Sequence, residues 1–179
     1  MKLLLTSFGT SLEQDKELEM LLGMKLTEAK VAYIENAYDV YDDEASLQEG
    51  REEQRKDLFV LTGGNPFYLR WMMRITGADE IIRELVGQGK VYVGASASSV
   101  VAGPTLRHFD NQDDPNAAGE IIWEGLHLTD VVVVPHVDNA EFGTGCREAG
   151  EKLKAEGYPT QFITDAQAFL IDGDERRVI

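Results

Sequence analysis

Ser96 follows a predicted strand at a point where a nucleophilic hydroxyl could be presented. It lies in VYVGASASSVVAGP (91–104), where a β-branched run ends at Gly94 and a short apolar helix is predicted to begin. This strand–serine–helix context is that of a nucleophile elbow, whose sharp turn exposes the hydroxyl and directs backbone N–H groups at a developing oxyanion. A tight packing turn built from small residues is the alternative interpretation.

His136 directly follows another strand-like run, VVVVP (131–135). Because sites in open parallel sheets form at the carboxyl ends of the strands, an imidazole there could accept the proton of the Ser96 hydroxyl. A histidine that only satisfies hydrogen bonds in a loop is the alternative. His108 and His127 lack the strand-end setting, and we interpret them as surface or structural residues.

A Ser–His pair needs a carboxylate that orients the imidazole and stabilises its charged form. The acidic segment HFDNQDDPN (108–116) offers Asp110, Asp113 and Asp114, although such a segment can also be a solvated loop. The glycine pair in LTGGN (61–65) could bring a second backbone N–H to the oxyanion, because glycine allows close approach of the backbone. The same pair could equally form a plain strand-to-helix turn.

Strand-like runs alternate with helical patterns along the chain, which predicts an α/β fold with a mainly parallel sheet. Several runs are almost wholly apolar, as strands covered on both faces are. The predicted strands are Lys2–Thr6, Lys30–Glu35, Leu58–Thr62, Lys90–Gly94, Val131–Val134, Thr160–Thr164 and Ala168–Asp172. The predicted helices are 11–22, 43–56, 66–75, 79–88, 97–102 and 140–156.

The composition indicates one domain over residues 1–179, with 43% hydrophobic residues and a net charge of −15. Such a charge repels phosphate backbones and anionic membranes, so we expect neither nucleic acid nor a membrane as partner. The single Cys146, the lack of a signal-peptide pattern and the shortness of the apolar runs predict a cytoplasmic protein. Without metal-ligand spacing or a phosphate-binding loop, we expect no metal and no cofactor.

The junction between Lys56 and Asp57 departs from the usual pattern. A polar helical segment runs into the apolar strand DLFVLTGG almost without a turn signal, whereas such connections usually take about 2–6 residues. This predicts that a segment is missing at 56/57. If the chain is continuous there, the shortened sheet has an open edge, and we expect it to be covered by a second subunit in a homodimer.

The stretch LFVLTGGNPFYLRWMMRITGADEIIRELVGQGKVYVGASASSVVAGP resembles the core of the dipeptidase E group of serine peptidases, which includes aspartyl dipeptidases and cyanophycinase relatives. The similarity lies in the GGN-P-F segment, the serine elbow followed by a proline, and the later PH at a strand end. AKVAYIENA and ITDAQAFLIDGDERRVI resemble the flanking strands, so the resemblance spans nearly the whole chain. It implies a three-layer sandwich with a mainly parallel sheet, similar to the flavodoxin-like class I glutamine amidotransferase domain.

The resemblance also implies an acyl-enzyme mechanism that cleaves short peptides with a Ser–His–Asp triad. The triad would be Ser96, His136 and Asp113, since members of the group carry the acid in the loop after the elbow. Gly64 and Ala97 would donate the N–H groups of the oxyanion hole. Within this class, dipeptides with an N-terminal aspartate are the candidate substrates.

Asn65 and Arg147 are the candidate substrate-binding residues, with Arg147 near the position of a basic residue that recognises the aspartate side chain in aspartyl dipeptidases. Ser98 stands where the elbow of the group has glycine, and the loop after His136 is shorter than in aspartyl dipeptidases. A related amidase or esterase with the same triad is one alternative function. A non-catalytic binding protein on the same scaffold is another.

Overall fold

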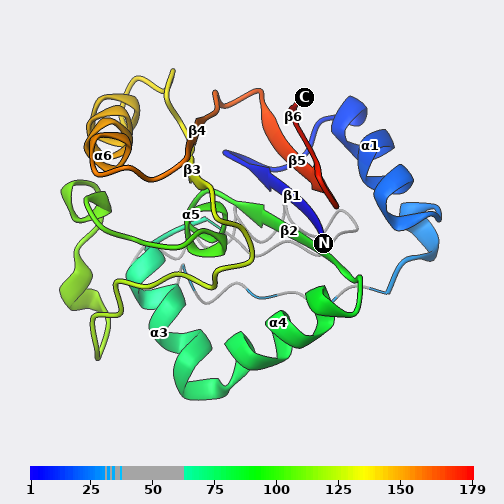
Figure 1. Cartoon of the computed structure of the whole chain (residues 1–179), viewed down its shortest axis with the longest axis horizontal. Coiled ribbons are helices and arrows are strands. Elements are labelled where there is room, and N and C mark those ends of the chain that lie inside the picture. The colour runs from blue at the N-terminus through cyan, green and yellow to red at the C-terminus, as the bar shows by residue number, and fades with distance from the viewer. Residues whose placement is uncertain (31, 33, 35–36, 38–62) are drawn as a thin grey trace, which may run out of the picture.

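A computed structural model of the chain describes residues 1–30, 32, 34, 37 and 63–179 (Figure 1). The strand predicted at 58–62 and the helix predicted at 43–56 lie outside these residues, as do residues 31, 33 and 35 of the strand predicted at 30–35. The junction at 56/57 lies outside them as well, so the missing segment stays a prediction.

The central sheet has the strand order β2-β1-β5-β6, formed by Val91–Ala95, Lys2–Thr6, Ala168–Asp172 and Glu175–Val178. β2 runs parallel to β1, whereas β5 is antiparallel to β1 and β6 is antiparallel to β5. A second sheet pairs β3 (Val132–Val134) in parallel with β4 (Thr160–Phe162). The fold is therefore α/β, as predicted.

The expectation of a mainly parallel sheet is wrong for the strands that the structure describes, because their pairing is mixed. The chain turns back after β5 through the two residues Gly173 and Asp174 and adds β6 as a hairpin strand that was not predicted. Gly173 has a φ of 60°, which a two-residue hairpin turn requires and glycine adopts without strain. β6 is polar and largely exposed, so it lacks the apolar pattern that marks the other strands.

Five α-helices match predicted ones closely, because clear capping residues mark several of their ends. In α1, Ser11 and Gln14 form a reciprocal capping box, and α3 begins with the cap Asn65 followed by Pro66. Gly77 ends α3 in the left-handed conformation. The helices are α1 (Leu12–Leu22), α3 (Pro66–Thr76), α4 (Ala78–Gly87), α5 (Ala97–Ala102) and α6 (Gly143–Ala155), with 3-10 turns η1 (Leu26–Glu28), η3 (Phe109–Asn111) and η4 (Pro115–Ala117).

The two faces of β1 bury different sets of side chains, since alternate residues of a strand point to opposite sides. Leu4 packs in a cluster with Leu18 and Leu21 of α1. Leu3 and Leu5 belong to the larger cluster, which includes Phe67 of α3 and residues of α4, α5 and α6. Figure 1 shows α1 on the opposite side of the sheet region from α3 and α4. Across the described residues, no helix is both long enough and apolar enough to cross a bilayer.

Candidate active site

The ends of four strands, β1 to β4, converge at one edge of the molecule. β1 and β2 are parallel and in register, so the residues that follow them lie side by side, and the backbone N–H of Ser96 donates to Thr6 O at 2.9 Å. The hydroxyl of Ser7 accepts a hydrogen bond from the N–H of His136 at 2.9 Å and donates to Thr164 O at 3.1 Å. Ser7 thus ties the end of β1 to the segments that follow β3 and β4.

Ser96 occupies the sharp strand–helix turn that its setting predicts. It precedes α5 with φ 52° and ψ −113°, a conformation that non-glycine residues rarely adopt and that costs about 1–3 kcal/mol. Such strain is concentrated at functional sites, where the surrounding structure holds it. Gly94 makes the turn possible, because a Cβ there would lie 3.0 Å from the backbone of Ser98 and Ser99.

Ser98 replaces the glycine of the usual elbow and is accommodated by hydrogen bonds. Its buried hydroxyl accepts from Ala95 N at 2.7 Å and donates to Ala95 O at 2.9 Å. The hydroxyl of Tyr92 donates to the carbonyl oxygen of Ser98 at 2.8 Å, and burial raises the pKa of this phenol. The Ser98 side chain therefore stabilises the turn through these hydrogen bonds. A glycine at this position would leave the Ala95 N–H without this partner.

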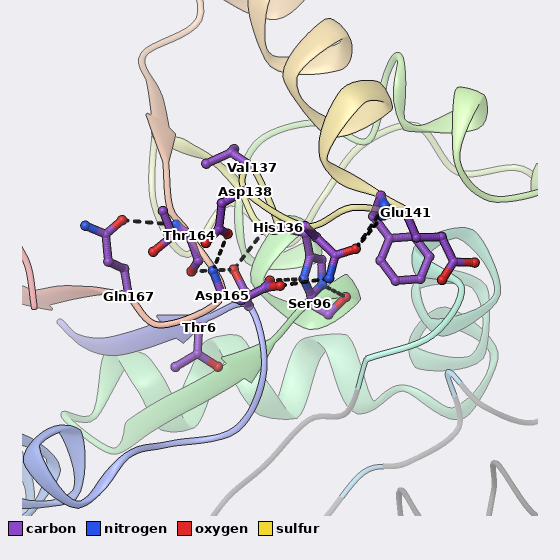
Figure 2. Close-up of polar contacts among 12 residues, drawn as sticks. Thr6, Ser96, His136, Val137, Asp138, Glu141, Thr164, Asp165 and Gln167 are labelled. Atoms are coloured by element: carbon purple, nitrogen blue, oxygen red, sulfur yellow. Dashed lines mark hydrogen bonds and ion pairs between the residues drawn. The ribbon is translucent and has the colours of Figure 1, made fainter.

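Ser96, His136 and Asp165 form a continuous hydrogen-bonded chain (Figure 2). The Nε2 of His136 lies 2.8 Å from Ser96 Oγ, and its Nδ1 lies 2.7 Å from Asp165 Oδ1. The imidazole is almost fully buried, whereas the Asp165 side chain is 26% exposed. A hydroxyl, an imidazole and a carboxylate in this order can activate the hydroxyl as a nucleophile.

The choice of Asp113 as the carboxylate beside His136 is corrected by this geometry. Asp165 holds that position because β4, which precedes it, lies parallel beside β3, whose end carries His136. The carboxyl ends of neighbouring parallel strands meet at one edge, so Asp165 and His136 are brought together. Asp165 directly follows the strand predicted at Thr160–Thr164, and this signal could have identified it.

The acidic segment that was expected to supply the triad acid forms short helical turns. Asp110 lies within η3, and Asp114 begins η4, where its carboxylate accepts from Asn116 N at 2.9 Å. Asp113 lies between these turns, and its N–H donates to the carbonyl oxygen of Phe109.

Asp165 is held from two sides by residues of the segment after His136. The Nδ2 of Asn139 donates to Asp165 Oδ2 at 2.8 Å, and Asp138 Oδ1 accepts from Asp165 N at 2.8 Å. The Oδ1 of Asn139 also accepts from the N–H groups of Glu141 and Phe142. Asn139 therefore joins the carboxylate to the start of α6, a role that the sequence analysis missed.

The residues predicted for the oxyanion hole lie at helix starts. Ala97 is the first residue of α5. Gly64 has a φ of 116°, and a Cβ there would lie 2.3 Å from Ala37 O, so only glycine fits. Asn65, predicted to bind substrate, uses its side chain within the protein: Oδ1 accepts from two N–H groups at the start of α3, and Nδ2 donates to Asp114 O at 2.8 Å.

Arg147 lies in α6, near the segment that carries His136. Its guanidinium donates to Val137 O and, at 3.4 Å, to Thr144 Oγ1. Burial, with Asp113 and Asp165 nearby, raises the pKa of the neighbouring Cys146 thiol to about 11. At neutral pH this thiol is protonated and does not compete with Ser96 as a nucleophile.

Comparison with known proteins places this chain among peptidases. The family model described as peptidase family S51 matches residues 42–179. An uncharacterized peptidase of Listeria innocua is 34% identical over 126 residues, which cover 68% of this chain and 58% of that protein. An uncharacterized peptidase of Listeria monocytogenes is 33% identical over 138 residues, covering 73% and 64%. In these alignments the chain spans about three-fifths of the length of the curated relatives.

A solved structure shows the same fold. A crystal structure described as a candidate peptidase E protein from Listeria monocytogenes EGD-e superposes with a TM-score of 0.76 and 25% sequence identity. The superposition covers 99% of this chain and 97% of that one.

Proposed function

Because this chain belongs to peptidase family S51, we propose that it is a serine peptidase that hydrolyses short peptides with Ser96, His136 and Asp165. The observation that carries the proposal is the pair of hydrogen bonds of His136, at 2.8 Å to the hydroxyl and 2.7 Å to the carboxylate. Both lie within the distance range that proton transfer requires.

The first half of the reaction forms an acyl-enzyme. Ser96 Oγ attacks the scissile carbonyl carbon while His136 Nε2 takes the hydroxyl proton. Asp165 holds the Nδ1 proton and stabilises the imidazolium that results. The same proton then passes from Nε2 to the leaving amine as the C–N bond breaks. In the second half, His136 activates a water molecule that hydrolyses the ester on Ser96.

The tetrahedral intermediate carries a negative oxygen that needs hydrogen-bond donors. We assign this role to the backbone N–H groups of Gly64 and Ala97. Support for the assignment comes from the strict steric need for glycine at residue 64 and from the place of Ala97 directly after the nucleophile. Donors of this kind typically contribute a factor of about 10²–10³ to the rate.

The expectations for architecture, location, oligomeric state and substrate recognition belong to the same proposal. We propose that the architecture is the amidotransferase-like three-layer sandwich. We also propose that the protein acts in the cytoplasm as a homodimer and binds short peptides as substrates. Arg147, beside the segment of His136, is the proposed contact for a substrate carboxylate. An aspartate at the peptide's N-terminus would supply such a group.

A fluorophosphonate probe tests the activated serine directly. We expect covalent labelling of wild-type protein at Ser96, and no labelling of Ser96→Ala with an unchanged thermal unfolding midpoint, since one hydroxyl contributes little to folding. Hydrolysis of dipeptides compared with simple esters and amides of the same acyl group separates a peptidase from an esterase or amidase. Equal labelling of wild type and Ser96→Ala would show that another residue is the nucleophile.

A further inference from the structure

Two phenyl rings contact the imidazole of His136 and remain open to solvent. The ring centroid of Phe8, which follows the end of β1, lies 4.6 Å from that of His136, with the rings at 63°. The ring of Phe142, at the start of α6, lies 5.6 Å away at 51°. Phe8 is 51% exposed and Phe142 39%, whereas His136 itself is 5% exposed. Exposed phenyl surface therefore lies directly beside the imidazole.

The chemistry of the imidazole determines which part of a substrate meets these rings. His136 Nε2 must come within hydrogen-bonding distance of the leaving amine in order to donate its proton. The residue that carries this amine is the one directly after the scissile bond. Its side chain consequently lies beside the groups that surround the imidazole, and Phe8 and Phe142 are such groups.

We propose that Phe8 and Phe142 form an apolar subsite for the side chain of the residue directly after the scissile bond. The preferred substrates are then short peptides with leucine, phenylalanine or a similar large apolar residue at that position. Burial of such a side chain removes apolar surface of both partners from water. The inference rests on the proposed function. It specifies the residue on the amine side of the scissile bond and makes no statement about the residue on the acyl side.

The charge around the rings favours an apolar residue over an acidic one. Glu141 directly precedes Phe142, and Asp138 and Asp165 lie close to His136. A carboxylate in the leaving side chain would be repelled by these three carboxylates. The neighbouring cation Arg147 is the proposed contact of a carboxylate on the acyl side, and its guanidinium donates to Val137 O and Thr144 Oγ1. We therefore expect Ala-Asp to be a poorer substrate than Ala-Leu.

The test is a set of dipeptides that share the acyl residue, namely Ala-Leu, Ala-Phe, Ala-Gly and Ala-Asp. We expect kcat/KM for Ala-Leu to exceed that for Ala-Gly by about 10-fold or more, the range that a few methylenes provide in an apolar pocket. Phe8→Ala and Phe142→Ala should each lower this Leu/Gly ratio at least threefold. Phe8→Leu should retain most of it, because leucine is also large and apolar. Ile81→Ala, which removes a 58% exposed apolar side chain from α4, is the matched control and should leave the ratio unchanged.

The outcomes separate this inference from the proposed function. If the probe labels Ser96 and dipeptides are cleaved, but Ala-Leu and Ala-Gly react equally fast, the subsite is refuted and the peptidase stands. If Phe8→Ala and Phe142→Ala slow both dipeptides by the same factor, the rings only shield or position His136, and the subsite is refuted as well. Absence of labelling and of all hydrolysis refutes the proposed function together with the subsite. Thermal unfolding of each variant shows whether it is folded, and Phe8→Leu remains informative if Phe8→Ala is not.

Discussion

Replacement of Asp165 by asparagine tests the assignment of the triad acid with the smallest change in shape. The substitution removes the negative charge that faces His136 Nδ1 at 2.7 Å. An amide nitrogen there would donate to Nδ1, so that the ring proton moves to Nε2. The imidazole could then no longer accept the hydroxyl proton of Ser96, whose Oγ lies 2.8 Å from Nε2.

The size of the effect follows from the charge pair that forms in the transition state. At a charge separation of about 4 Å and an effective dielectric constant of about 20, a carboxylate stabilises an imidazolium by about 4 kcal/mol. This corresponds to about 10³-fold in rate. Because the Asp165 side chain is 26% exposed, solvent screening reduces this factor, while the wrong tautomer adds to the loss. We therefore expect kcat/KM to fall by about 10³–10⁴, as for the equivalent change in a serine protease triad.

The assay measures kcat/KM on one dipeptide and the rate at which a fluorophosphonate labels Ser96. Asp113→Asn is the matched control, since it removes one acidic charge from the segment that was first expected to supply the triad acid. We expect it to keep both rates within about threefold, because Nδ1 of His136 is already hydrogen-bonded to Asp165. A larger loss in Asp113→Asn than in Asp165→Asn would refute the reasoning from the strand ends.

Three further predictions concern residues around the site and in the core. Ser98→Gly should lower the free energy of unfolding by about 1–3 kcal/mol, because the buried Ala95 N–H loses its partner; an unchanged urea midpoint would contradict this. Asp79→Ala should lower it by about 3–5 kcal/mol, because the buried guanidinium of Arg70, 3.0 Å away, loses its countercharge; a loss below about 1 kcal/mol in urea unfolding would speak against it. Cys146 should resist a thiol reagent at pH 8 in the native state and react in urea. Burial raises its pKa from 9.0 to about 11. The contribution of the protonated thiol to the stability of the fold is therefore complete below pH 9 and lost as the pH rises through 11. Rapid labelling of the native protein at pH 8 would contradict the burial of this thiol.

Local patterns in the sequence were sufficient to identify most of the described elements and two of the three residues in the hydrogen-bonded chain of Ser96, His136 and Asp165. α5 and β1 were predicted with their observed ends, because apolar runs and small-residue turns mark them without reference to the rest of the chain. Ser96 and His136 were predicted because each lies just beyond the end of a strand, and strand ends can be recognised from neighbouring residues alone. The exposed β6 was missed, since its polar residues carry no such pattern.

Only the tertiary structure decided which strand ends are neighbours. The order of strands in a sheet depends on contacts between distant segments, and so the sequence did not show that β4 lies beside β3 and brings Asp165, rather than Asp113, to His136. The same holds for Ser7, whose hydroxyl joins three strand ends. The phenyl rings beside the imidazole also come from segments far apart in the chain, and their common position follows from the contact between the end of β1 and the segment after β3, which no local pattern encodes.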